Sequence, residues 1–330
     1  MGTSVPISNL VQAFRAASRS LTARTVKKPA ASTRIIPATL PRVDGVSIFS
    51  VDVEDWFHIL GVPSVPAFSM WDKLPSRVER NFCRLLDLFS ERKVHVTCFF
   101  LGWIGERYPH LVREAASRGH EIASHGYEHR LVFDMTPQEF FDDALRARIA
   151  LEDISGKPVL GYRAAGFSAV EHTPWFFERL EAAGYVYDSS VFPAKRGHGG
   201  MVGFPRLPHV VEGTALVEFP MTVSDFLGQP ICFFGGGYLR LFPEWLILRE
   251  TRQVLANGQP VLFFIHPREI DKDHPHLRMN LARRFKSYVN LRRTEEKVKR
   301  ILDSFPVISF EEFLKRNPWT LEDHARAVAG

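Results

Sequence analysis

The sequence predicts an α/β fold in which short strands alternate with helices in the manner of a barrel. Two observations support this prediction. First, short runs of β-branched and aromatic residues alternate with segments whose apolar residues recur at helical spacing, which is typical of βα units. Second, polar residues that could carry chemistry directly follow several of the apolar runs. An α/β barrel keeps its active site at the carboxyl ends of its strands, so these residues are expected to lie together.

The expected elements follow one another along the chain from residue 46. We expect strands at 46–53, 94–100, 121–124, 159–162, 186–188, 216–219, 261–265 and 307–309. Helices are expected at 78–89, 105–118, 137–154, 174–183, 243–257 and 291–304. Several of these helices open with proline and end near glycine, as the physics of helix termini favours.

Length and composition favour one large domain. A chain of 330 residues with 45% hydrophobic content can bury a large core, which fits one barrel with additions better than two small domains. The net charge is only +5, and residues 1–43 hold seven Lys or Arg and no acid, so the remainder is close to neutral. Because no basic stripe falls in the predicted barrel, binding to nucleic acid is not expected. The three cysteines form no CxxC motif and are expected to be core residues in a reducing compartment.

The two ends of the chain are expected to lie outside the barrel. Residues 1–45 are basic and are predicted to be a mostly disordered tail, with weak contact to an anionic membrane surface as an alternative. Arg15, Arg19 and Arg24 interrupt every candidate apolar stretch, so no secretory signal or membrane span is expected, which points to a cytoplasmic location. The barrel is expected to occupy 46–314, and 315–330 a second tail.

A pair of histidines follows the expected strand at 121–124. His125 and His129 are four residues apart, and a single helical turn after the strand would aim both rings at one point. Neutral imidazole is a good ligand for zinc and related divalent metals. The pair therefore predicts part of a metal site.

Three acidic residues end the first expected strand. Because side chains alternate along a strand, Asp52 and Glu54 should point to one side and Asp55 to the other. One carboxylate and two histidines would make a three-ligand set with an open position for water, as in catalytic zinc sites. We expect Glu54 to be the ligand and Asp52 to remain available as a base.

Three further polar residues follow short apolar segments. They are Arg163 in the segment Gly-Tyr-Arg-Ala, Asp188 in the segment Tyr-Asp-Ser-Ser, and His266 after the run at 261–265. With the acid pair and the HxxxH motif, these make five motifs in a fixed order. In that order they resemble the polysaccharide deacetylase family with the NodB-homology domain, carbohydrate esterase family 4. The residues within these motifs are most similar to those of the subgroup associated with bacterial exopolysaccharide export and exosortase gene clusters.

The resemblance implies a distorted barrel with fewer than eight strands and a hydrolase that removes N-acetyl groups from an amino-sugar polysaccharide. It implies a divalent metal, with zinc expected, held by Glu54, His125 and His129. Asp52 would take a proton from water, and Arg163 would orient Asp52. His266 would protonate the departing amine, and we expect Asp188 to hold His266 in the correct tautomer.

The sequence departs from the family pattern at two motifs. The usual first motif has adjacent aspartates, whereas Val53 intervenes here, so the ligand would be Glu54 or Asp55. The third motif usually has Arg-x-Pro-aromatic, but Arg163 is followed by Ala-Ala-Gly-Phe without the proline. Relatives with such divergence include allantoinase-like hydrolases of cyclic amides, which is the alternative function. A member that only binds polysaccharide is the third possibility.

Overall fold

The computed structural model describes residues 45–196 and 199–317, and its main sheet carries the candidate site. Seven parallel strands and one antiparallel edge strand follow one another around this sheet. Their order is β10 (Val261–Ile265), β1 (Ser47–Val53), β2 (Thr97–Phe100), β3 (Glu121–Ser124), β4 (Gly161–Tyr162), β5 (Tyr187–Asp188), β7 (Val217–Glu218) and the antiparallel β6 (His209–Val210). The sheet is curled but stays open between β10 and β6.

Strand β1 lies next to the edge strand β10 and pairs with three other strands. It pairs with β10 along one edge, while its other edge pairs first with β11 (Val307–Ile308) and then, from Ser50 onward, with β2. Strand β11 thus extends the position of β2 rather than adding another one, which leaves seven parallel positions. The predicted distorted α/β barrel is confirmed, with seven parallel positions and the antiparallel β6 at one edge. All seven residues of β1 are buried, as expected for a strand covered on both faces.

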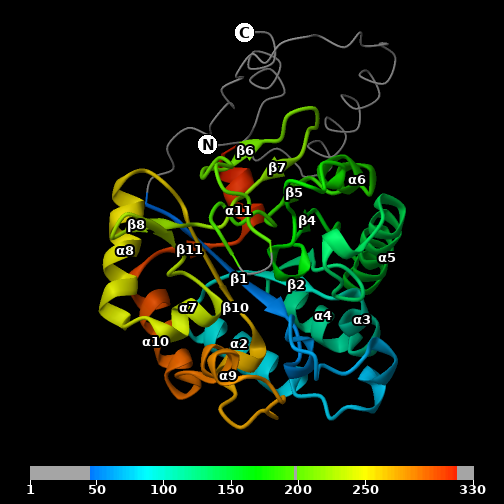
Figure 1. The fold of residues 1–330 in the computed structure, drawn as a ribbon, viewed down its shortest axis with the longest axis horizontal. Helices are drawn as coiled ribbons and strands as arrows, with labels where there is room; N and C mark the ends of the chain where they lie inside the picture. The colour runs from blue at the N-terminus through cyan, green and yellow to red at the C-terminus, as the bar shows by residue number, and fades with distance from the viewer. Residues whose placement is uncertain (1–44, 197–198, 318–330) are drawn as a thin grey trace.

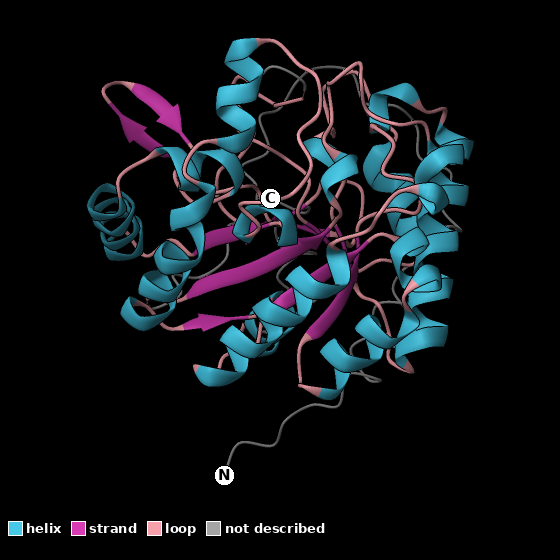
Figure 2. Cartoon of the chain, turned by 90° about the horizontal axis from the view of Figure 1, so that it is seen from below, coloured by secondary structure: helices cyan, strands magenta, loops and turns pink. Residues whose placement is uncertain are grey.

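Helices cover the outer face of the sheet, as Figures 1 and 2 show. The helices are α2 (Val78–Glu91), α3 (Gly102–Arg107), α4 (Pro109–Ser117), α5 (Pro137–Ser155), α6 (Phe176–Ala182), α7 (Gly236–Leu241), α8 (Glu244–Ala256), α9 (Leu281–Tyr288), α10 (Leu291–Ser304) and α11 (Phe310–Arg316). Phe49, Val51 and Val53 point outward into the core under these helices, while Ile48 belongs to a second core inside the barrel. This alternation sends Asp52 inward.

Helix α11 closes the barrel interior at the amino ends of the strands. Phe310 packs against Tyr187 and Phe219, with ring centroids 5.2 and 5.0 Å apart. Its backbone N–H donates to Thr97 at the start of β2, and the N–H of Glu311 donates to Glu121 at the start of β3. The interior is therefore filled from this end, and a site can open only at the carboxyl ends of the strands.

Several elements differ from their expected bounds. The helix expected at 105–118 is two helices, α3 and α4, because Pro109 pushes Tyr108 out of helical geometry, with φ −129° and ψ 60°. The hairpin of β8 (Ser224–Phe226) and β9 (Gln229–Ile231), and helices α7, α9 and α11, were not predicted. The C-terminal tail expected from residue 315 begins inside α11.

The predicted basic tail falls almost wholly on residues 1–44, and most of the C-terminal tail on 318–330, both outside the described residues. Among the residues that the structure describes, no helix is both long and apolar enough to cross a bilayer.

Candidate active site

The end of β1 places Asp52 and Glu54 on one side of the strand and Asp55 on the other. Both Asp52 and Glu54 line a pocket at the carboxyl ends of the strands. The Asp55 carboxylate instead caps the short 3₁₀ helix η1 (Trp56–His58) and accepts hydrogen bonds from Ser76 and from the backbone at the start of α2. Asp55 is therefore an anchor for the chain after β1, and its carboxylate is fully engaged away from the pocket.

The two histidines reach the pocket from a loop rather than from a helical turn. Gly126 and His129 both adopt left-handed backbone conformations, with φ 75° and 56°. The loop is held by Asp143 on α5, whose carboxylate accepts from the N–H groups of Tyr127 and Glu128 at 2.8 and 3.2 Å. A non-glycine residue with positive φ stores strain, which is common at functional sites. The expected helical turn is therefore wrong, because the chain forms a loop here, but the two rings still point toward one place.

Glu54, His125 and His129 form a three-residue cluster that fits a divalent metal. The Nε2 atoms of His125 and His129 lie 3.0 and 2.9 Å from the same Oε1 of Glu54, and the ligand atoms all fall within 4.8 Å of one another. The Nδ1 of His125 lies 2.7 Å from the carbonyl oxygen of Arg163. Donation of Nδ1–H to this carbonyl leaves the Nε2 lone pair facing the cluster, as in metal-binding histidines. Two histidines and one carboxylate are a ligand set of catalytic zinc sites.

The pKa of Glu54 is unusually low for a buried carboxyl group. Burial alone would raise the pKa of Glu54, but its interactions with His129, His266 and His125 hold it well below its usual value. Glu54 is therefore ionised, which is the form that coordinates a metal.

Arg163 holds Asp52 from beneath the pocket. Its Nη1 donates to Asp52 Oδ1 at 2.6 Å and to the Ser50 hydroxyl at 2.8 Å. Its other N–H groups donate to Ser189, and the guanidinium stacks 4.1 Å from the ring centroid of Phe99. Arg163 is completely buried. These contacts fix one oxygen of Asp52 and leave Oδ2 directed at the pocket, 3.8 Å from His266 Nε2.

His266 lies at the end of β10 and is held by Glu269. Both the backbone N–H and the Nδ1 of His266 contact Glu269 Oε2, at 3.0 and 3.2 Å. Glu269 Oε1 in turn accepts from Arg240 Nε at 2.9 Å. Because the Nδ1 proton is held by a carboxylate, His266 Nε2 faces the pocket, 3.6 Å from Glu54 Oε1. Burial lowers the pKa of His266, but Glu54, Glu269 and Asp52 together raise it above its usual value.

Asp188 does not have the role expected for it. Its Oδ1 accepts from Ser190 at 2.5 Å, and Ser190 also accepts the N–H of Ala164, so the pair braces the chain after Arg163. Burial raises the pKa of Asp188 to about 6, with Glu218 opposite it on β7. Glu269 orients His266 instead, because the turn at Pro267 brings the Glu269 carboxylate back against the ring of His266.

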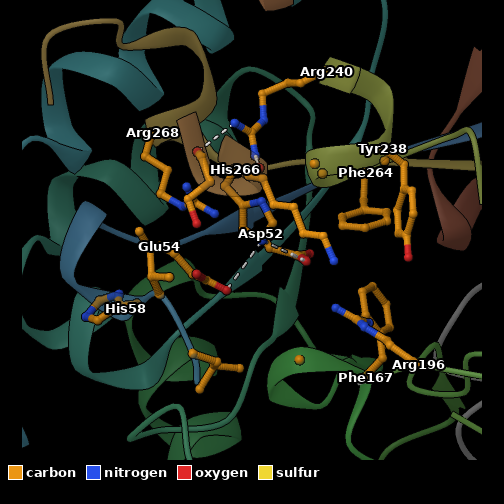
Figure 3. A pocket seen from close by; sticks show the side chains of 18 of the residues that line it. Asp52, Glu54, His58, Phe167, Arg196, Tyr238, Arg240, Phe264, His266 and Arg268 are labelled. Carbon is orange, nitrogen blue, oxygen red and sulfur yellow. Dashed lines mark hydrogen bonds and ion pairs between the residues drawn. The ribbon is translucent and has the colours of Figure 1, made fainter. Parts of the chain in front are cut away.

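The pocket enclosed by these groups has a volume of about 300 Å³ (Figure 3). Its floor holds Asp52, Glu54, His125, His129 and His266. Its walls are formed by the following residues from other parts of the chain: His58, Ile59, Leu60, Gly166, Phe167, Phe192, Arg196, Gly235, Gly236, Gly237, Tyr238, Arg240, Leu241, Phe264, Arg268, Arg283, Lys286, Ser287 and Val289. Tyr238 and Phe264 offer apolar faces on which a sugar ring could stack.

Among the residues that the sequence analysis did not single out, Glu269 lies behind the pocket in contact with His266, and His58 lines it. Glu269 could have been found from its spacing, since an acid three residues after His266, across a proline-opened turn, has the pattern of a reciprocal cap. His58 had no such signal. Its Nδ1 accepts the N–H of Asp55 at 3.0 Å, and its buried Nε2 has no hydrogen-bond partner among the described residues. Burial, with the charge of His129, lowers the pKa of His58 well below its usual value.

Two family models match consecutive parts of the chain. Residues 63–186 match the polysaccharide deacetylase family, and residues 189–315 match a domain of unknown function (DUF3473). The peptidoglycan deacetylase of Helicobacter pylori is 31% identical over 188 residues, which are 57% of this chain and 61% of that protein. A peptidoglycan-N-acetylglucosamine deacetylase of Bacillus cereus is 27% identical over 73 residues, 22% of this chain and 26% of its own length. The chain thus spans less than two thirds of these curated relatives.

Solved structures show the same fold at low identity. A structure described as a polysaccharide deacetylase from Mycobacterium smegmatis has a TM-score of 0.57 at 22% identity, covering 86% of this chain and 95% of that one. One from Pseudomonas aeruginosa PAO1 has a TM-score of 0.55 at 18% identity, covering 82% and 90%. The Puue allantoinase has a TM-score of 0.54 at 15% identity, covering 83% and 92%.

The two matched segments build one pocket. His125, His129 and Arg163 come from the first segment, whereas His266 and Glu269 come from the second, and β10 of the second pairs with β1 along five residues. The second segment is therefore part of the barrel rather than a separate module. Residues 63–186 are thus similar to the polysaccharide deacetylase family, and the segment of unknown function completes the same sheet.

Proposed function

We propose that this protein is a metal-dependent hydrolase that removes N-acetyl groups from an amino-sugar polysaccharide. The observation that carries the proposal is the convergence of a Glu-His-His cluster, an arginine-held aspartate and a glutamate-held histidine on one pocket. The polysaccharide deacetylase match and the peptidoglycan deacetylase relatives support the same substrate class. By its motif resemblance we assign the protein to bacterial exopolysaccharide production.

Glu54, His125 and His129 would hold the divalent ion, for which zinc is our choice. Such an ion, when bound, supplies acidification of a water molecule and polarisation of the acetamide carbonyl. Asp52 accepts the proton of the attacking water at Oδ2, because its Oδ1 is occupied by Arg163. His266 then donates the proton on Nε2 to the departing amine, and Glu269 keeps Nδ1 protonated and stabilises the cationic ring.

The alternative function, hydrolysis of a cyclic amide, shares this fold. The Puue allantoinase shares the fold at only 15% identity. The fold alone therefore does not distinguish hydrolysis of a cyclic amide from removal of an N-acetyl group. The Glu-His-His cluster favours the deacetylase, because the motif resemblance implies a divalent metal for that activity and the three ligand groups converge as such a site requires.

The direct test offers both substrate classes to the purified, zinc-loaded protein. We expect acetate and new free amines from N-acetylglucosamine oligomers, detected enzymatically and by mass spectrometry, and no opening of the allantoin ring. Ring opening without acetate release would replace the proposed function with the cyclic-amide one. Tight binding of the oligomers without acetate release would identify a binding protein instead.

A further inference from the structure

The charges that line the pocket are unbalanced. The described lining includes five basic residues, Arg196, Arg240, Arg268, Arg283 and Lys286, against two acids, Asp52 and Glu54. Both acids are already engaged, Asp52 with Arg163 and Glu54 with the two histidines. Arg240 is paired with Glu269. The other basic residues have no acidic partner within the part of the chain that the structure describes.

Three of these arginines keep buried N–H groups without an acceptor among the described residues. The unbonded atoms are Nη1 of Arg196, Nε and Nη1 of Arg268, and Nε of Arg283. Figure 3 shows Arg196 and Arg268 on either side of Asp52 in this view. A buried donor without an acceptor is costly, so such groups normally bond to water or to a bound ligand.

Two of the guanidinium groups are held in place by other contacts. The Arg196 guanidinium lies 5.0 Å from the ring centroid of Phe167 and 5.2 Å from that of Phe192. Arg283 donates from Nη2 to the carbonyl oxygen of Leu60 at 2.6 Å. Burial lowers the pKa of Arg196, and burial and the charge of Arg268 lower that of Arg283. A bound anion would relieve this uncompensated charge.

We propose that the polysaccharide bound in this pocket is acidic, and that Arg196, Arg268 and Arg283 bind a carboxylate or phosphate on the sugar chain beside the acetamide. This inference rests on the proposed deacetylase function. Guanidinium groups suit such anions because their planar N–H pairs match two oxygens at once. All three arginines belong to the segment of unknown function, which thereby gains the role of recognising the charge of the substrate.

The test compares matched oligosaccharides. The first carries N-acetylglucosamine alternating with glucuronic acid, the second is the same chain with its carboxylates reduced to alcohols, and the third carries phosphate monoesters instead. We expect kcat/KM for an anionic chain to exceed that of the reduced chain by roughly 10- to 100-fold, the range of charge-assisted hydrogen bonds. A preference for the phosphorylated chain over the uronic acid chain assigns the anion as phosphate, and the reverse assigns it as carboxylate.

The arginines are tested by the ratio of kcat/KM for the anionic and reduced chains. Arg268→Gln and Arg283→Gln should each lower this ratio by about 10-fold. The matched control is Arg284→Gln, an exposed neighbour on α9 outside the pocket lining, which should keep the parental ratio. Equal kcat/KM for all three chains, with a ratio near one in every variant, overturns the acidic-substrate proposal and leaves the deacetylase function standing.

Binding separates a failure of this proposal from a failure of the proposed function. If no chain releases acetate but calorimetry shows that the anionic chain binds, and that Arg268→Gln weakens it, the deacetylase function fails and the acidic ligand stands. If neither catalysis nor binding distinguishes the anionic chain from the reduced one, the acidic-substrate proposal is wrong.

Discussion

Charged side chains at the floor of the pocket are paired, whereas Arg196, Arg268 and Arg283 on its wall keep N–H groups that are unbonded among the described residues. On the floor, Asp52 and Arg163 are buried and paired with each other, and the hydroxyl groups around them complete the hydrogen bonds. On the wall, Arg268 and Arg283 are only partly buried and retain unbonded N–H groups. His266, also on the floor, is intermediate, because one ring nitrogen is paired and 15% of its side chain is exposed.

The difference corresponds to two different tasks. Groups that move protons must be fixed before the substrate arrives, because misplacement by about 1 Å can cost roughly 100-fold in rate. Groups that bind substrate must keep their hydrogen bonds available for it. We therefore expect substitutions of the floor residues to abolish turnover. Substitutions of the residues that hold them in place should instead alter the pH dependence of turnover or the stability of the protein.

The largest effect is expected from removing a ring of the metal cluster. His125→Ala or His129→Ala should remove the bound ion and lower the rate by about 10³-fold or more, as loss of one member of a catalytic unit does. Elemental analysis and acetate release measure the two effects separately. The control is His172→Ala, an exposed histidine outside the pocket. Full metal content in both cluster variants would contradict the ligand assignment.

Asp52→Asn separates the base from the ligands. Because Asp52 lies outside the Glu-His-His cluster, the variant should keep its metal, yet turnover should fall by about 10²- to 10⁴-fold when the proton acceptor is removed. Metal content and kcat are measured on the same preparation. Loss of the ion together with the activity would place Asp52 among the ligands instead.

His266→Ala should also lower kcat by about 10²- to 10⁴-fold while the metal stays bound. The sign of its pH effect is specific. His266 acts in its protonated form, so the parental rate should fall as pH rises through its raised pKa. The variant should lack this basic limb. An unchanged profile with full activity would exclude His266 as the acid.

Glu269→Gln tests the orientation of His266 with a smaller expected effect. Without the carboxylate, the pKa of His266 falls, so the basic limb should move to lower pH and kcat should drop about 10- to 100-fold. The change also leaves Arg240 buried without its partner, which costs about 3–5 kcal/mol of stability. Thermal unfolding of the single variant and of Glu269→Gln/Arg240→Gln separates the two effects. A basic limb at the parental pH in a folded variant would contradict the positioning role.

Asp55→Asn should have the smallest effect on activity. The Asp55 carboxylate accepts from Trp56, Ser76, Arg77 and Val78, so the loss is one of stability, about 1–3 kcal/mol, with metal content unchanged. Glu54→Gln, the neighbouring change, should instead remove the ion and leave these anchoring bonds intact. The opposite pattern would show that Asp55, not Glu54, is the acidic ligand.

The strand pattern predicted the floor because its residues obey local rules. Alternation along β1 separated Asp52 and Glu54 from Asp55, and the apolar runs before His125 and His266 placed both at carboxyl ends of strands. These features depend on a few consecutive residues, so they can be read without the fold.

The rest of the site depends on contacts that no local pattern encodes. Arg268 and Arg283 reach one wall from different elements, the short helix at Pro267–Ile270 and α9, and their missing partners are visible only when the whole pocket is assembled. Asp188 was expected to hold His266 because it is a polar residue at the end of a strand. The packing of β5 beside β4 and β7 instead turns it toward Ser190. The left-handed loop at His129 was likewise unpredictable, since Asp143 on α5 holds it.

The most direct test of the account is a metal titration of the chelated protein, followed by acetate release from an N-acetylated amino-sugar oligomer. The account predicts no release before metal is added, and a rise in rate that stops at one zinc ion per chain. The same titration of Glu54→Gln should show no rise. Acetate release from the fully chelated protein at the parental rate would contradict the claim that Glu54, His125 and His129 form a catalytic metal site.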